Sequence, residues 1–212
     1  MKKNIYIIGA GDFGRELESW LEDLPDFNEN YLIKGYLDSN LNSLTNRPSD
    51  YKIIGKLTGF EFKKNDNVLI TISNPQVRKR IADSLKNKVK FFKYVAPNTT
   101  LGKFTNIGEG SIICPNCFIS TNTQIKDFVI INAGSVIGHD CIINSYSSLM
   151  ASVDVGGNVN IGEEVFIGTK ATIVPGKSIA SNIIIGAGSL VIRSLKKVGS
   201  YFGNPAKFLG KY

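Results

Sequence analysis

The chain contains a single histidine, His139, which stands directly before an acid, Asp140, and seven residues after Asn132. An imidazole exchanges a proton near neutral pH, and a neighbouring carboxylate can fix its tautomer and raise its basicity. The pair could therefore act as a general base with its orienting acid. A lone histidine is more often structural or merely exposed, so the elements that surround it have to decide between these interpretations.

A glycine-rich segment near the N-terminus is the second candidate for chemistry. Gly9-Ala10-Gly11-Asp12-Phe13-Gly14 follows an apolar run at residues 5–8 and precedes apolar residues at helical spacing, from Phe13 to Leu24. A strand, a G-x-G-x-x-G turn and a helix form a phosphate site, because glycines admit a close backbone approach and the helix N-terminus offers free N–H groups. The alternative is that the glycines only make a tight turn.

The rest of this region alternates between expected strands and helices. The further elements are strands at residues 32–37, 68–72 and 91–95 and a helix that begins at Pro75. The second strand ends at Asp38, where an acid can accept hydrogen bonds from ribose hydroxyls or a base edge. The pattern predicts a small Rossmann-like parallel α/β domain, over residues 1–95, with a nucleotide-sized crevice at its strand ends.

From Leu101 to Val191 every sixth residue is aliphatic, sixteen in register without an exception. A repeat of six residues is the signature of a parallel β-helix. Position five of the hexads is small or apolar almost everywhere, and one large and one small inward residue per strand let three strands close into a triangular prism. Position two is glycine in seven hexads, which we expect to ease the corner, where backbone torsions are unusual. Three hexads per coil give about five coils.

Within this repeat, His139 takes the third position of its hexad and should point outward, whereas Ile137 and Cys141 should point inward. Cys117 also falls on the inward position five, so the Cys114-Pro-Asn-Cys117 segment indicates packing rather than metal or redox chemistry. A zinc carbonic anhydrase on the same repeat would need three histidines. We therefore expect no metal.

Composition indicates an ordinary globular protein. The 212 residues are 42% hydrophobic and 20% charged, with a net charge of +7, and the basic residues are largely scattered. This spread argues against a nucleic-acid partner and suits ligands that carry phosphates. Three cysteines suit a reducing compartment, and no stretch is long and apolar enough for a signal peptide or a membrane span. A soluble, cytoplasmic protein is expected.

The ladder resembles the left-handed β-helix of hexapeptide acyltransferases. The segment from Asn132 to Cys141, preceded by a glycine-rich α/β domain, is similar to the sialic acid O-acetyltransferases and the nucleotide-amino-sugar N-acetyltransferases of glycan biosynthesis. The resemblance implies a Rossmann-like nucleotide-sugar-binding domain over residues 1–95 and a left-handed β-helix acetyltransferase domain with a C-terminal tail over 96–212. It also implies a homotrimer with active sites between subunits.

The same resemblance assigns roles to individual residues. His139 would be the base, Asp140 its orienting acid, Asn132 a neighbour of the acceptor, and Gly157 the donor of an N–H group to the oxyanion. The nucleotide sugar would meet Gly11, Asp12, Phe13, Asp38, Ser39 and Ser73, and acetyl-CoA would meet Ser148, Thr169 and Ala187. The chain departs from the family in two places: Phe13 and Ser148 stand where the family often has histidines.

The function that the resemblance implies is transfer of acetyl from acetyl-CoA to the amino group of a nucleotide-activated amino sugar, of the UDP-4-amino-sugar or GDP-perosamine type. O-acetylation of a sialic-acid-type sugar is the alternative within the same fold. A non-catalytic, nucleotide-binding β-helix scaffold is an alternative from another class. A nicotinamide-dependent oxidoreductase would rest on the glycine motif alone, and the chain lacks the second half that such enzymes need.

Overall fold

The computed structural model describes residues 2–211. The chain forms two compact units: residues up to 73 together with 77–93, and residues 74–76 together with those from 94 onward. Each unit is described by itself. Within residues 2–211, no helix is both long and apolar enough to cross a membrane.

The first unit is built on a parallel five-stranded sheet with the order β3-β2-β1-β4-β5. Its strands are β1 (Lys3–Ile8), β2 (Tyr31–Leu37), β3 (Ile53–Gly55), β4 (Asn67–Ile70) and β5 (Lys90–Phe91), and its helices are α1 (Asp12–Leu21), α2 (Phe27–Asn30) and α3 (Pro75–Leu85). The apolar run in β1 is buried because the strand is central. The strand order reverses beside β1, which puts the ligand crevice expected of such a sheet at the carboxyl ends of β1 and β4.

Three features of this unit differ from the sequence-based expectations. The strand expected at 91–95 is two strands: β5 does close the sheet beside β4 but ends at Phe91, and Tyr94–Val95 forms β6, which pairs with a strand of the second unit. Val95 stands six residues before Leu101, so it already belongs to the aliphatic ladder. The elements β3 and α2 were not expected, since three and four residues are too few to show a period. Helix α1 ends at Leu21 rather than Leu24.

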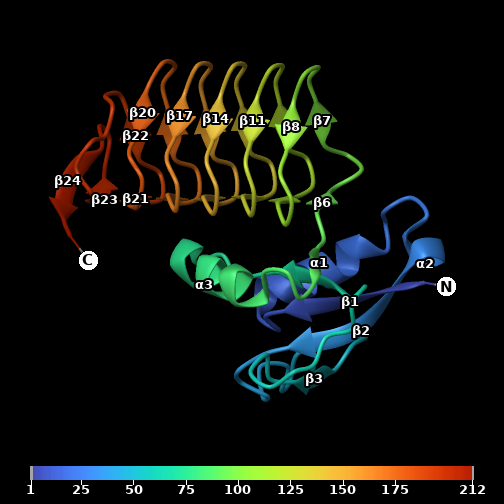
Figure 1. Ribbon diagram of the computed structural model, residues 1–212. Coiled ribbons are helices and arrows are strands. Elements are labelled where there is room, and N and C mark those ends of the chain that lie inside the picture. Colours follow the sequence, from blue (N-terminus) through green and yellow to red (C-terminus); the bar gives the residue numbers. More distant parts are fainter. Residues whose placement is uncertain (1, 212) are drawn as a thin grey trace. The chain divides into compact units, whose positions relative to one another are not determined.

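The second unit is a parallel β-helix, whose coils follow one another along the row in Figure 1. Face I contains β7 (Thr100–Leu101), β10 (Phe118–Ile119), β13 (Val136–Ile137), β16 (Asp154–Val155), β19 (Thr172–Ile173) and β22 (Leu190–Val191). Face II contains β8 (Asn106–Ile107), β11 (Gln124–Ile125), β14 (Ile142–Ile143), β17 (Asn160–Ile161) and β20 (Ser178–Ile179). Face III contains β6, β9 (Ile112–Ile113), β12 (Ile130–Ile131), β15 (Ser148–Leu149), β18 (Phe166–Ile167), β21 (Ile183–Ile185), β23 (Gly199–Phe202) and β24 (Lys207–Gly210).

The strands β6 to β20 make five coils, and β21 and β22, with a bridge from Leu195 to Ile179, make a sixth. The expectation of about five coils was therefore close. The ladder residues fill the interior: Ile137 and Cys141 are fully buried, and the same holds for most of the series. The first coil is less covered: Leu101 is 45% exposed and Ile107 is only partly buried.

The glycines at position two do not have the role expected of them, which was to supply the unusual backbone torsions at the corners of the prism. The left-handed backbone conformation falls on position four, where every residue from Phe104 to Gly188 in steps of six has a φ between +55° and +71°. The glycines at position two serve a close approach between coils instead. A Cβ on Gly162, for example, would lie 2.5 Å from the backbone nitrogen of Ser181 in the next coil. We refer to each corner by the faces that it joins, as the I–II, II–III and III–I edges.

The C-terminal end of the prism is closed by an antiparallel pair. Strand β23 adds to β21 in parallel, and β24 then folds back along β23. The ring of Tyr201 packs edge-on against Phe208 at 5.4 Å between centroids, and the ammonium of Lys197 lies 3.9 Å from the centroid of Phe208.

Candidate active site

His139 lies on the I–II edge, in the turn between β13 and β14. Its side chain is 56% exposed, because the neighbouring ladder residues Ile137 and Cys141 take the interior positions. The ring nitrogen Nδ1 lies 2.6 Å from Oδ2 of Asp140. The imidazole is thus accessible from outside the β-helix while one of its nitrogens is engaged.

Asp140 is held from two sides. Its Oδ2 faces His139, and its Oδ1 accepts a hydrogen bond of 2.6 Å from Nδ2 of Asn122 in the preceding coil. The hydrogen bond from Asn122, followed by the one from His139, holds the pKa of the Asp140 carboxyl below its ordinary value. An ionised carboxylate can only accept, so Nδ1 of the neutral ring carries the proton and Nε2 keeps its lone pair. This nitrogen can take up a proton from a ligand.

Gly157 adjoins the imidazole from the following coil. A Cβ built on Gly157 would lie 2.6 Å from Nε2 of His139, so the ring occupies space that only glycine leaves open. The N–H groups of Gly156 and Asn158 bond to the carbonyls of Ile173 and His139, whereas that of Gly157 has no acceptor in the described chain. The arrangement leaves one backbone donor free beside the imidazole.

The other residues expected in the acetyl-transfer site lie elsewhere on the prism. Asn132, Thr169 and Ala187 are on the III–I edge, after β12, β18 and β21, and Oδ1 of Asn132 accepts the N–H of Ala133 at 2.6 Å. Ser148 lies in β15 on face III and is fully buried. One chain therefore brings together His139, Asp140 and Gly157 but not the remaining four.

The residues expected to bind the nucleotide sugar share one edge of the sheet in the first unit. They follow the carboxyl ends of three parallel strands: Gly11, Asp12 and Phe13 after β1, Asp38 and Ser39 after β2, and Ser73 after β4. The carboxylate of Asp38 accepts the N–H of Ala10 at 2.7 Å and that of Asn40 at 2.8 Å. It ties the glycine-rich turn to the loop after β2.

The three glycines of the turn have different roles. Gly9 has a φ of +102°, which favours glycine, and a Cβ on Gly14 would lie 2.1 Å from the carbonyl oxygen of Gly9. These two are required by the turn and by the close packing of α1. A Cβ on Gly11 would meet no atom within 4 Å, so this glycine leaves open space at the start of α1. The tight-turn interpretation thus explains Gly9 and Gly14 but not Gly11.

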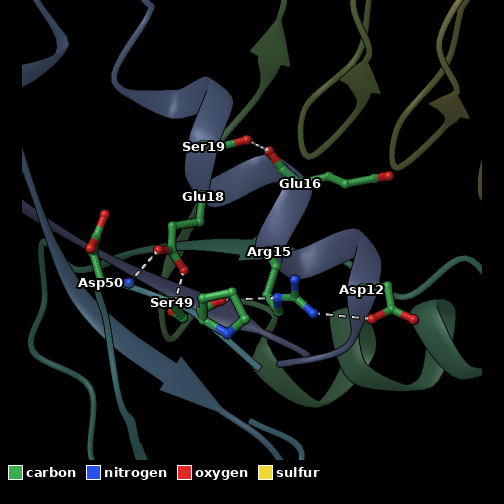
Figure 2. A pocket seen from close by; sticks show the side chains of 8 residues that line it. Asp12, Arg15, Glu16, Glu18, Ser19, Ser49 and Asp50 are labelled. Carbon is green, nitrogen blue, oxygen red and sulfur yellow. Dashed lines mark hydrogen bonds and ion pairs between the residues drawn. The ribbon is translucent and has the colours of Figure 1, made fainter. Parts of the chain in front are cut away.

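A hollow of about 590 Å³ runs beside α1, lined by the helix and by residues 48–50 (Figure 2). Glu18 joins its two walls, because its carboxylate accepts hydrogen bonds from Ser49 Oγ and from the N–H of Asp50. Among the expected substrate residues, only Asp12 lines this hollow.

Two arginines that the sequence did not single out contact Asp12. Its Oδ1 accepts from Nη1 of Arg47 at 2.6 Å and from Nη1 of Arg15 at 3.4 Å. Arg15 could have been noticed three residues after Asp12 on the same helix face. Arg47 could not, since it arrives from a loop with no periodic pattern.

The cysteines are packing residues, as their place in the ladder predicted. All three are buried and none forms a disulfide in the described chain, and burial raises the pKa of the Cys117 thiol to about 11. Within residues 2–211, no three His, Cys, Asp or Glu side chains gather as a metal site would require.

Sequence families match both parts of the chain. The profile of the PglD N-terminal domain matches residues 4–85, and the profile of the GMPPB C-terminal domain matches residues 81–189, about half of the chain. The chain belongs to the hexapeptide-repeat acetyltransferases with a left-handed β-helix. No curated protein sequence matches this acetyltransferase at a significant level.

Several solved structures share the fold of this acetyltransferase over nearly its whole length. WeeI from Acinetobacter baumannii AYE is 27% identical, with 98% of this chain and 100% of that chain covered and a TM-score of 0.84. The acetyltransferase domain of PglB from Neisseria gonorrhoeae FA1090, in complex with acetyl coenzyme A, is 24% identical, covering 99% and 100%, with a TM-score of 0.85. A variant of perosamine N-acetyltransferase from Caulobacter crescentus, in complex with CoA and GDP-perosamine, is 22% identical, covering 98% and 97%, with a TM-score of 0.84.

Proposed function

We propose that this acetyltransferase moves an acetyl group from acetyl-CoA to the amino group of a nucleotide-activated amino sugar, with His139 as the general base. The observation that carries the proposal is the exposed His139–Asp140 pair, whose geometry leaves Nε2 free to accept a proton. The solved relatives that bind acetyl coenzyme A, or CoA with GDP-perosamine, support the class of donor and acceptor. The acceptor is of the UDP-4-amino-sugar or GDP-perosamine type.

The transfer is a direct attack of the amine on the thioester. Nitrogen forms a bond to the acetyl carbon while Nε2 of His139 takes the amine proton, since only a neutral amine is nucleophilic. The carbon–sulfur bond then breaks, and the thiolate of CoA leaves with the proton from the imidazolium. Asp140 stays ionised and stabilises the charged ring. The free N–H of Gly157 supplies a donor for the oxyanion that forms during attack.

The first unit holds the nucleotide portion of the acceptor in this proposal. Gly11 leaves space for a phosphate at the N-terminus of α1, and the residues around it are Asp12, Phe13, Asp38, Ser39 and Ser73. The nucleotide portion does not react, but its binding holds the amine in position for attack. This positioning supplies much of the rate enhancement.

We also propose a homotrimer in which neighbouring copies complete each site. The support is the division of the candidate residues between two edges of the prism: His139 and Gly157 on one, Asn132, Thr169 and Ala187 on another. A second copy that presents its III–I edge to the I–II edge of the first would complete the set. Mixing His139→Ala with Asn132→Ala chains should restore part of the activity that each variant lacks alone. No recovery in mixed oligomers would rule out a shared site.

The decisive experiment follows free thiol release from acetyl-CoA in the presence of a panel of UDP-, GDP- and CMP-linked sugars, with and without a free amino group. Transfer to an amino sugar is expected, and His139→Ala should reduce kcat by about 10²–10⁴-fold with the fold intact. Wild-type rates in the variant would refute the role of the base. Turnover only with hydroxyl acceptors would establish O-acetylation instead, and no turnover with any sugar would favour a scaffold.

A further inference from the structure

The carboxylate of Asp140 lies on an exposed edge, where burial does not fix its orientation. Its side chain is 42% exposed and the structure gives it two side-chain partners, His139 on Oδ2 and Asn122 on Oδ1, each at 2.6 Å. An exposed aspartate with one partner could rotate about its side-chain bonds and release the ring. The contact from Asn122 removes that freedom by holding the oxygen that His139 does not use.

Asn122 is itself held in register by the β-helix. It lies eighteen residues before Asp140, at the same position of the preceding coil, and its N–H bonds to the carbonyl of Lys103 at 2.9 Å. The N–H of Asp140 bonds to the carbonyl of Thr121 at 3.1 Å, which ties the two coils together beside the site. Asn122 has a φ of +57°. Asparagine tolerates this conformation better than most residues and also brings a donor.

We propose that Asn122 is a positioning residue for the base: its amide orients Asp140, and Asp140 in turn keeps His139 in the tautomer with the proton on Nδ1. The kinetic part of this inference rests on the proposed function. The competing interpretation is a link between coils without a role in catalysis. Asn106 makes such a link on face II, with its Nδ2 3.2 Å from Oε1 of Gln124.

The charges around the pair are few. The residues that flank it on the I–II edge, Thr121 and Asn122 before it and Gly157 and Asn158 after it, carry no ionisable side chain. The nearest charged residues on the edge and the adjoining face I are Asp154 in β16, one coil after His139, and Lys103 and Lys177, two coils before and after it. Arg193 lies three coils after it. A change in the pH dependence on altering Asn122 therefore reports on the Asp140–His139 contact.

Two substitutions at Asn122 separate the effect of its hydrogen-bond donor from the effect of its size and backbone conformation. Asn122→Gly keeps the left-handed backbone without strain but removes the amide. Asn122→Asp keeps the shape but, when ionised, offers no donor and repels Asp140. Both should lower kcat at pH 8 by about tenfold with KM nearly unchanged, a smaller loss than removal of the base. The acid limb of the pH–rate profile for Asn122→Gly should move to lower pH, since a loosened carboxylate stabilises the imidazolium less.

The single histidine allows a readout that needs no substrate. ¹⁵N NMR of the neutral imidazole should show one tautomer in the wild-type protein, with Nε2 unprotonated, and a mixture in Asn122→Gly. A matched control is Asn182→Gly, which alters another asparagine at position four with a φ of +60°, on the II–III edge. It should leave the tautomer and kcat as in the wild type.

The outcomes distinguish this inference from the proposed function. An unchanged tautomer and pH profile in Asn122→Gly, or a wild-type kcat in Asn122→Asp, would overturn the positioning role while acetyl transfer stands. A shifted tautomer in a protein that transfers no acetyl group would support the positioning role and refute the function.

Discussion

The Cα of Gly157 faces the imidazole of His139 so closely that a Cβ there would lie 2.6 Å from Nε2. Nε2 is the atom to which the proton transfer is assigned. Glycine at position 157 is therefore explained by the site rather than by the backbone, because no left-handed φ requires it. Gly157 therefore both leaves room for the base and carries the free N–H group.

Gly157→Ala should remove most of the activity and leave the fold intact. The new methyl group meets the end of a movable side chain, so the imidazole is displaced and the backbone is not. We expect kcat to fall by about 100-fold, within the range for losing a positioned base, while the melting temperature changes little. Steady-state kinetics and thermal unfolding check this. A wild-type kcat in Gly157→Ala would show that catalysis does not require the imidazole of His139 in this position.

Asp140→Asn should cost about 10²–10⁴-fold in kcat, nearly as much as loss of the base. The amide can donate to Nδ1, which favours the tautomer with the proton on Nε2 and so blocks proton uptake there. Asparagine suits the φ of +58° at this position, so the backbone is not strained. Activity across a pH series is the measurement. If the loss vanishes at high pH, the tautomer explanation is wrong.

The glycines at position two should matter more for stability than those at position four. Gly162→Ala places a Cβ 2.5 Å from the backbone nitrogen of Ser181 and should lower the free energy of unfolding by about 2–3 kcal/mol. Gly188→Ala meets no atom within 4 Å and carries only the left-handed strain of its φ of +66°, about 1–2 kcal/mol. Urea unfolding of both variants tests the order, and a smaller loss for Gly162→Ala would contradict it.

The cysteines should be unreactive in the folded protein. Burial raises the pKa of Cys117 from 9.0 to about 11, so the native thiol stays protonated at pH 8. Because the unfolded thiol ionises first, the stability contributed by this burial is present below pH 9 and declines as pH rises toward 11. Ellman's reagent at pH 8 should detect no fast-reacting thiol natively and three after denaturation. A rapid native reaction would mean that the β-helix interior opens.

The sequence predicted the β-helix well, because its interior imposes one condition on every sixth residue and Ile137 or Ile161 meets it visibly. The left-handed position was missed although glycine, asparagine or aspartate occupies nine of its fifteen places, because residues as different as Phe104, Glu164 and Lys170 occupy others. There the N–H bonds to a carbonyl of the preceding coil, as Glu164 does to Ser145, so the coil supports the conformation whichever side chain is present.

The contacts within the candidate site were predicted in part. His139 and Asp140 were recognised as neighbours in the chain, and the structure gives them a direct contact. Asn122 was missed although three hexads per coil place it one coil before Asp140. The repeat predicts which backbones are neighbours but not that the Asn122 side chain turns toward Asp140. Arg47 was missed for a similar reason, since its contact with Asp12 depends on a loop path that no repeat describes.

The antiparallel fold-back of β24 on β23 has a consequence for how copies of the protein meet. A parallel β-helix can lengthen without limit by stacking end on end, because its last coil offers the same unpaired backbone groups that each coil uses to recruit the next. At this end the chain reverses direction between Phe202 and Lys207, so face III ends in an antiparallel strand, and the turn bonds to both backbone groups of Leu190 on face I. Removal of residues 199–212 would leave a templating surface at the tip of the prism, and the shortened chain should form filaments rather than discrete particles.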